Sequence, residues 1–397
     1  MKIVKIETIR IKTFSNLLWV KLHSNEGLIG LGETFYGVGP VEKHIHEIIA
    51  FYLLGKDFSL IEMHQSNLIG YLGFKGTSAE MRARSAVDIA LWDLWGKSIN
   101  QPIHKMLGGK VRDKIRVYNT CAGSDYIKNE PTQSTNNFGL KKSGLYEDLD
   151  GFLHRADELA HSLLEMDISA MKIWPFDYAA EESFGHYISN TDLKKALVPF
   201  QKIRKSLGDK MDIMAELHSM WNRPEAVKIS RALEEYKPFW IEDPVKMDQL
   251  SSLDKVANST INPIAAGETL GGSADYKSLI EMNCLSLIIL DVSWGGGFSE
   301  ARRIADMAET SHVPVAFHDC TGPVALTASI HLALSTKNCY IQEIVRAFYF
   351  GWYKELVDCL PPLNNGFITA PDGDGLGISL LTDVTKRKDC KIMESKI

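Results

Sequence analysis

Six polar or charged residues end short apolar segments in the second half of the chain, and they recur every 23 to 27 residues. They are Glu216, Glu242, Glu268, Asp291, His318 and Glu343. Helical segments fill the intervals; the clearest follows Asn222, a capping residue, and has Pro224 in its first turn. In a (β/α) barrel all strand ends meet at one mouth, whereas a doubly wound sheet brings together only those near its switch point. The constant period therefore predicts an α/β fold with a (β/α) barrel.

The first part of the chain has a different organisation. Residues 16–23 and 27–33 are β-rich and are separated by a polar turn, which predicts a hairpin. Over residues 41–109 the apolar residues take helical spacing, and this region closes at Leu107-Gly108-Gly109. We predict an N-terminal α+β domain over residues 1–113.

The barrel domain is expected over residues 114–362. Inside it, residues 123–152 are polar and rich in Gly, Ser and Asn, which predicts a loop inserted near the barrel mouth. Residues 363–397 have the composition of turns with a short strand. We expect this C-terminal segment to return to the N-terminal domain.

Composition and charge exclude several classes of protein. The chain has 397 residues, 45% of them hydrophobic and 24% charged, which is average globular usage and argues against disorder. A net charge of −6 provides no basic field for nucleic acid or anionic membranes. The six cysteines form no CxxC pair. The first residues lack the apolar core of a signal peptide. Every apolar run is far shorter than the ~20 residues of a membrane span. We expect a cytoplasmic protein with a small-molecule partner and no contact with nucleic acid or membrane.

Glu216, Glu242 and Glu268 predict a metal site. A single glutamate at a strand end is usually solvated or paired with a lysine, but three at one mouth would repel one another and require a cation. Ligation by oxygen alone favours Mg²⁺ or a similar hard ion. We therefore predict one divalent cation, Mg²⁺, on these three carboxylates.

His318 and Asp291 end adjacent strands. A carboxylate bonded to an imidazole fixes its tautomer and raises its basicity, so this pair suits a general base. The alternative is a buried histidine that binds a backbone carbonyl, with Asp291 capping the following turn.

His218 and Lys172 are further candidates. His218 lies two residues beyond Glu216 and is expected on the same side of the strand, as a fourth metal ligand, a general acid or a wall residue; we favour the acid. Lys172, with Trp174 on the same face, is placed to neutralise a substrate carboxylate, and the alternative is a surface lysine.

Several motifs, taken together, resemble the enolase superfamily, specifically its mandelate racemase-like subgroup. They are SAVDIALWDLWGK over residues 85–97, WIEDP at Glu242, GET at Glu268, DVSWGGG from Asp291, HD at His318, QE at Glu343 and PDGDGLG in the tail. The resemblance spans nearly the whole chain. It implies a modified TIM barrel of the (β/α)7β type under a capping domain, a homo-oligomer, and abstraction of the proton α to a carboxylate with the help of Mg²⁺.

The resemblance also narrows the reaction. Racemases of this subgroup carry a second lysine where this chain has Trp174, which cannot titrate. Residues 216–218 form Glu-x-His, similar to the Asp-x-His of sugar-acid dehydratases such as galactonate and mannonate dehydratases, with Glu in place of Asp. The implied reaction is dehydration of a sugar acid to a 2-keto-3-deoxy acid. The implied roles are His318 as base oriented by Asp291, His218 as acid, Lys172 on the substrate carboxylate and Glu343 hydrogen-bonded to the enediolate.

Two other functions fit the same residues. A racemase or epimerase would use His318 and His218 on opposite faces, and would exchange the C2 proton without loss of water. A non-catalytic, metal-dependent sugar-acid binding protein would bind without exchange. Substrate contacts are expected from aromatic residues that could equally be packing residues: Tyr36, Trp174, Trp221 and Trp294.

Overall fold

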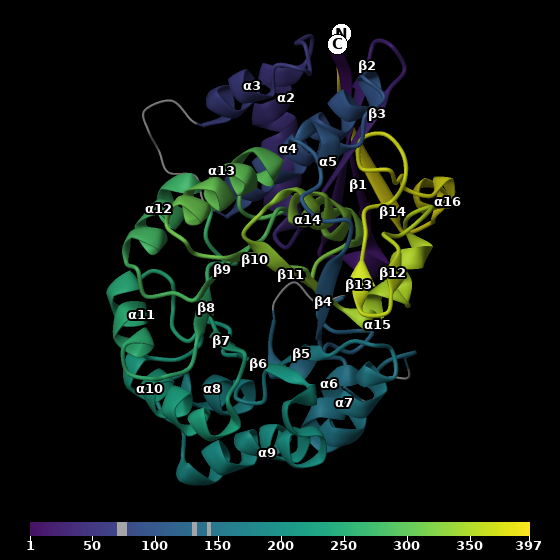
Figure 1. The fold of residues 1–397 in the computed structure, drawn as a ribbon. Coiled ribbons are helices and arrows are strands. Elements are labelled where there is room, and N and C mark those ends of the chain that lie inside the picture. Colours follow the sequence, from purple (N-terminus) through teal and green to yellow (C-terminus); the bar gives the residue numbers. More distant parts are fainter. Residues whose placement is uncertain (70–77, 129–132, 141–143) are drawn as a thin grey trace.

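The computed structural model describes residues 1–69, 78–128, 133–140 and 144–397. It contains a four-stranded antiparallel sheet with its helices, placed at one side of an eight-stranded parallel barrel (Figure 1). The predicted fold class, a (β/α) barrel with an N-terminal α+β capping domain, is confirmed.

The capping sheet has the strand order β14-β1-β2-β3, and neighbouring strands are antiparallel. Its last strand comes from the end of the chain, so both termini lie together at this sheet (Figure 1). The strands are β1 (Ile3–Ile11), β2 (Leu17–Ser24), β3 (Ile29–Phe35) and β14 (Cys390–Lys396). The helices are α1 (Val38–His44), α2 (Ala50–Leu53), α3 (Ile61–Leu68), α4 (Ala79–Ser98) and α5 (Ile103–Met106).

Helix α4 packs directly on strand β3, and two glycines of β3 make this close approach possible. A Cβ at Gly32 would lie 1.9 Å from the carbonyl oxygen of Ala86, and a Cβ at Gly30 would lie 2.1 Å from that of Ala90. The same helix also contacts α13 of the barrel. It therefore joins the capping sheet to the barrel.

The barrel is closed by parallel pairing of its first strand with its last. In order, its strands are β4 (Ile115–Thr120), β5 (Ala170–Ile173), β6 (Asp212–Glu216), β7 (Trp240–Glu242), β8 (Ile264–Ala266), β9 (Leu287–Leu290), β10 (Val315–Phe317) and β11 (Cys339–Ile344). The helices between them are α6 (Asp148–His154), α7 (Ala156–Leu164), α8 (Asp177–Ser183), α9 (Asn190–Leu207), α10 (Arg223–Ala232), α11 (Leu250–Ala257), α12 (Ser273–Glu281), α13 (Gly297–Thr310) and α14 (Pro323–Ser335). No helix of the described ranges is both long and apolar enough to cross a membrane.

Side chains fill the interior of the barrel, so it is a packed core rather than a pore. Tyr118 and Trp240 meet there edge to face, with ring centroids 5.3 Å apart. Smaller residues such as Ala170, Ala265 and Ala316 complete this buried cluster. The packed interior leaves the carboxyl ends of the strands as the place for a site.

Local sequence signals explain several elements. The Asn222 side chain accepts a hydrogen bond from the backbone N–H of Glu225 at 3.0 Å and so caps α10, with Pro224 in the first turn as predicted. Within the polar segment predicted as an insertion, residues 129–132 and 141–143 lie outside the described residues. The described remainder has a short 3-10 turn, Thr135–Asn137, before α6.

The C-terminal part of the chain contacts both sheets. A short hairpin, β12 (Leu363–Asn364) and β13 (Phe367–Ile368), adds to the barrel sheet, where β13 is antiparallel to β4. Helix α16 (Thr382–Lys386) then leads into β14, which pairs along β1.

Replacing Gly32 by Ala is expected to lower the midpoint of thermal unfolding, because the added Cβ has no space against the Ala86 carbonyl. Overpacking of this kind costs about 1–3 kcal/mol. Gly39→Ala in α1 is the matched control, since its added Cβ would meet no atom within 4 Å. Differential scanning calorimetry of both variants checks this; an unchanged midpoint for Gly32→Ala would contradict the direct strand–helix packing.

Candidate active site

Seven predicted site residues meet at the carboxyl ends of the barrel strands. Each is at most 9% exposed. Because the strands are short and parallel, their ends converge on one mouth, as the constant spacing in the sequence predicted. From β5 to β11 these residues are Lys172, Glu216, Glu242, Glu268, Asp291, His318 and Glu343.

Lys172 lies among three of the carboxylates. Its Nζ is 3.2 Å from Glu216 Oε2, 2.6 Å from Glu242 Oε1 and 3.1 Å from Glu343 Oε1. Burial, with repulsion from Glu216 and Glu343, raises the pKa of Glu242 to about 8, although Lys172 lowers it. Lys172 is therefore a buried counter-charge and not a surface lysine.

Glu216, Glu242 and Glu268 form a set of ligands suited to a metal ion. One carboxylate oxygen from each lies within 4.8 Å of the others. Glu216 Oε2 is buried and accepts no hydrogen bond, although Lys172 Nζ lies 3.2 Å away as an ion-pair partner. Three negatively charged oxygen donors, one of them without a hydrogen bond, fit a hard divalent cation such as Mg²⁺.

His318 is held by Asp291. Its Nδ1 lies 2.6 Å from Asp291 Oδ2, while Asp291 Oδ1 accepts hydrogen bonds from the backbone N–H groups of Ser293 and Trp294. The other ring nitrogen, Nε2, faces the cavity and lies 3.4 Å from Glu268 Oε2. Burial alone would lower the pKa of His318, but Glu268 and other nearby carboxylates raise it well above its usual value. Neutralising those carboxylates would favour the neutral imidazole that a general base requires.

His218 lies on the other side of the mouth, because β6 and β10 are four strands apart in an eight-stranded barrel. Its Nδ1 is 2.8 Å from Asp177 Oδ2 on α8, and its backbone N–H donates to Glu216 Oε1 at 2.7 Å. Burial alone would lower the pKa of His218, but Asp177 and Glu216 raise it to about 10. The ring is thus favoured in its protonated form.

The backbone at His218 supports a specific role for this residue. It takes a left-handed φ of 49°, and the next residue, Ser219, also has a positive φ of 56°. This conformation costs a residue other than glycine about 1–2 kcal/mol. The strained turn directs the imidazole to the cavity, where Trp174 contacts it edge to face.

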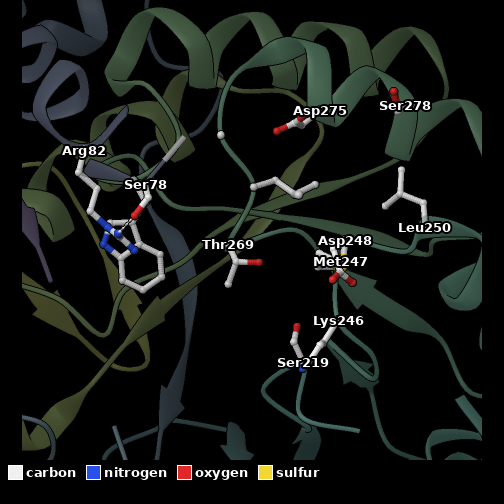
Figure 2. A pocket seen from close by; sticks show the side chains of 13 residues that line it. Ser78, Arg82, Ser219, Lys246, Met247, Asp248, Leu250, Thr269, Asp275 and Ser278 are labelled. Atoms are coloured by element: carbon white, nitrogen blue, oxygen red, sulfur yellow. Dashed lines mark hydrogen bonds between the residues drawn. The ribbon is translucent and has the colours of Figure 1, made fainter. Parts of the chain in front are cut away.

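Both histidines line one cavity of about 40 Å³. The capping domain contributes Tyr36, and the segment after β4 contributes Tyr126 and Gln133. Ligand pockets usually have volumes of about 300–1,000 Å³, so this cavity has room for reacting atoms but not for a whole sugar acid. A larger cavity of about 630 Å³ shares Trp294 with it as a lining residue. Figure 2 shows this larger cavity.

Three of the four aromatic residues predicted as substrate contacts, Tyr36, Trp174 and Trp294, line the small cavity. Trp221 does not: it is 2% exposed and lines a separate cavity with Phe184 and Met220.

Sequence reasoning missed several residues of the site. Asp177, the partner of His218, follows β5 by four residues and could have been considered as a polar residue near a strand end. Thr120, which donates to Glu343, and Tyr126 and Gln133 carry no periodic signal. Cys320 also lines the cavity, but burial raises the pKa of its thiol well above the usual value, which disfavours a thiolate nucleophile.

Known proteins resemble the chain over its whole length. A solved structure of an enolase of the mandelate racemase subgroup from Agrobacterium tumefaciens is 50% identical and superposes with a TM-score of 0.89, covering 100% of this chain and 99% of that one. A D-galactonate dehydratase of Ralstonia nicotianae is 29% identical, over 96% of this chain and 92% of the relative. A D-xylonate dehydratase of Haloferax volcanii is 26% identical, over 92% of this chain and 84% of the relative.

Family models match both parts of the chain. Residues 6–108 match the N-terminal domain of mandelate racemase and muconate lactonizing enzyme, and residues 155–384 match the enolase C-terminal domain-like family. The resemblance predicted from the motifs is therefore confirmed: the chain belongs to the enolase superfamily, in its mandelate racemase and muconate lactonizing enzyme subgroup.

Proposed function

We propose that this enolase-superfamily enzyme is a Mg²⁺-dependent sugar-acid dehydratase. It would remove the proton α to the carboxylate and eliminate the neighbouring hydroxyl as water, giving a 2-keto-3-deoxy acid. The observation that carries the proposal is the pair of histidines across the mouth, each bonded to its own carboxylate: His318 to Asp291 and His218 to Asp177. One histidine–carboxylate pair suffices to abstract the proton, and the second pair supplies the acid that elimination of water needs.

Substrate binding begins at the charged cluster. Glu216, Glu242 and Glu268 would hold Mg²⁺, which when bound supplies Lewis-acid stabilisation of negative charge on the substrate carboxylate. Lys172 adds a buried positive charge beside them, so the carboxylate of the substrate binds where it can pair with this ammonium group.

His318 then removes the C2 proton. Nε2 would accept this proton, because Nδ1 is hydrogen-bonded to Asp291 and Nε2 is the nitrogen on the side of the glutamates. That carboxylate orients the ring and stabilises the imidazolium ion that forms. The electron pair left on C2 moves into the carboxylate as an enediolate, to which Lys172 contributes stabilisation. Burial alone would raise the pKa of Glu343, but Lys172 and His318 lower it. Glu343 is thus favoured as a carboxylate, and it would contribute by accepting a hydrogen bond from a substrate hydroxyl.

His218 completes the reaction from the other side. It gives its proton to the C3 hydroxyl, the C3–O bond breaks, and water leaves as the enediolate electrons form the C2–C3 double bond. The resulting enol tautomerises to the 2-keto acid. Asp177 keeps His218 protonated for this step, and a positioned acid contributes about 10²–10⁴ in rate.

The relatives support this reaction class. Two of them are a D-galactonate dehydratase and a D-xylonate dehydratase, which align with most of the present chain. Trp174, which is buried against Phe152 and Tyr126, cannot serve as a second base, so a racemase would have to use His218. Burial alone would lower the pKa of His218, but Asp177 and Glu216 raise it to about 10, and the protonated ring suits an acid for elimination.

The two histidines have separable effects in this mechanism. His318→Asn is expected to abolish both exchange of the C2 proton and loss of water, because no base remains. His218→Asn should retain C2 exchange but lower elimination by about 10²–10⁴, since only the acid is lost. Proton NMR of the purified variants with Mg²⁺ in D₂O measures both processes; full-rate dehydration by His218→Asn would exclude it as the acid.

Glu242→Gln is expected to weaken Mg²⁺ binding by at least about tenfold, because a neutral amide replaces one of three anionic ligands. The matched control is Glu281→Gln on the exposed surface of α12, which should bind Mg²⁺ as the wild type does. Isothermal titration calorimetry compares the affinities. Equal affinity in wild type and Glu242→Gln would contradict the three-glutamate site.

Asp177→Asn tests the role of the carboxylate behind His218. Removing its charge should slow elimination by at least about tenfold while leaving C2 exchange near the wild-type rate, because His318 and Asp291 are untouched. The ratio of exchange to elimination, read by the same NMR assay, separates this effect from a general loss of folding, which would lower both rates together.

A further inference from the structure

The larger cavity beside the reacting groups is placed to hold the rest of a substrate. Thr269 and Ser219, next in sequence to Glu268 and His218, line it, and Trp294 is shared with the small cavity (Figure 2). A sugar acid whose carboxylate binds at the glutamates extends beyond the 40 Å³ cavity. Two larger cavities share lining residues with it: the 630 Å³ cavity shares Trp294, and another of about 520 Å³ shares Gln133 and His218. Among the described residues, only the first of these two is lined by an arginine, Arg82.

Arg82, from the first turn of α4 in the capping domain, is a cation on this wall that forms no ion pair with a described residue. Its Nη1 donates to Ser78 Oγ at 3.1 Å, while its buried Nε has no hydrogen-bond partner. Within the described parts of the chain it forms no ion pair, and residues 70–77, just before it, contain no Asp or Glu. A partly buried guanidinium with an unused donor is costly unless a ligand satisfies it.

The nearby carboxylates are not available to Arg82. Asp291 uses Oδ2 for His318 and Oδ1 for the backbone of Ser293. Asp275 lines the same cavity, but Figure 2 shows it on the far side from Arg82.

One indole ring separates Arg82 from the proposed base. The guanidinium carbon lies 5.4 Å from the centroid of the Trp294 ring, and that ring lies 5.0 Å from the imidazole of His318. The cation–π contact with Trp294 favours one orientation of the guanidinium, in which Nη1 is bonded to Ser78 and Nε has no acceptor. Arg82 is thus positioned for the part of the substrate that lies beyond the reacting carbons.

We propose that Arg82 binds the distal carboxylate of a sugar diacid, so that the substrate class is aldaric rather than aldonic acids. This rests on the proposed function above. A carboxylate can accept two parallel hydrogen bonds from Nε and an Nη of one guanidinium, which uses the donor that is otherwise unsatisfied. An aldonic acid ends in a neutral hydroxymethyl group, which would leave the positive charge of Arg82 unpaired.

Calorimetry with Mg²⁺ and paired ligands tests this subsite. The ligands are six-carbon aldaric acids and the aldonic acids of the same configuration, and His318→Asn serves as the background so that binding is measured without turnover. The diacid should bind at least about tenfold more tightly than its monoacid. Adding Arg82→Met should lower the affinity for the diacid by about 100-fold and the affinity for the monoacid by less than about threefold. Arg82→Lys should lie in between, because a lysine keeps the positive charge but cannot donate two parallel hydrogen bonds to a carboxylate.

Arg155→Met is the matched control and should change neither affinity, because Arg155 is a half-exposed arginine that lines neither cavity. Three results would overturn the proposed subsite. The two acids could bind with equal affinity, Arg82→Met could lower both affinities by the same factor, or neither acid could bind. The proposed function is tested separately on the wild type: a diacid that binds through Arg82 but is neither exchanged at C2 nor dehydrated would contradict the dehydratase and support the subsite.

Discussion

Repulsion among buried carboxylates, and the positive charge that offsets it, governs the structure of this site. Glu216, Glu242 and Glu343 all lie within 3.2 Å of one ammonium group, that of Lys172. One lysine cannot neutralise them all together with Glu268. Burial, and then repulsion from Glu216 and Glu343, raises the pKa of Glu242 to about 8 in spite of Lys172. Closure of the barrel by β4 and β11 is what forces these groups together. The site is therefore built to bind further positive charge, and then an anionic substrate.

The capping domain is linked to the same end of the barrel. Glu33 of β3 accepts hydrogen bonds from the backbone N–H groups of Val324 and Ala325, the first turn of α14, and from the indole of Trp19. This turn follows closely after His318. The capping domain thus holds the segment that carries the proposed base, while its own Tyr36 and Arg82 form walls of the two cavities.

The sequence predicted the barrel and its mouth because strand ends in a parallel barrel are periodic in sequence and converge in space. Glu216, Glu242 and Glu268 could be grouped for that reason alone. Arg82 could not, because a capping-domain helix reaches the mouth only through tertiary packing. Asp177 follows a strand end closely enough to be considered, but its pairing with His218 depends on how α8 packs. Trp221 shows the converse: it lies close to His218 in sequence, yet the turn after β6 directs it to another cavity. The spacing along the sequence predicts which residues lie at the strand ends, whereas tertiary packing determines which loop residues reach the site.

The most direct test of this account is proton NMR of the wild-type protein with sugar mono- and diacids in D₂O, with Mg²⁺ and after its removal by a chelator. The account predicts that, with Mg²⁺ only, one substrate loses its C2 proton and yields a product with a new C3 methylene signal. Exchange at C2 without that signal would contradict the dehydratase, and equal turnover after chelation would contradict the role of the three glutamates.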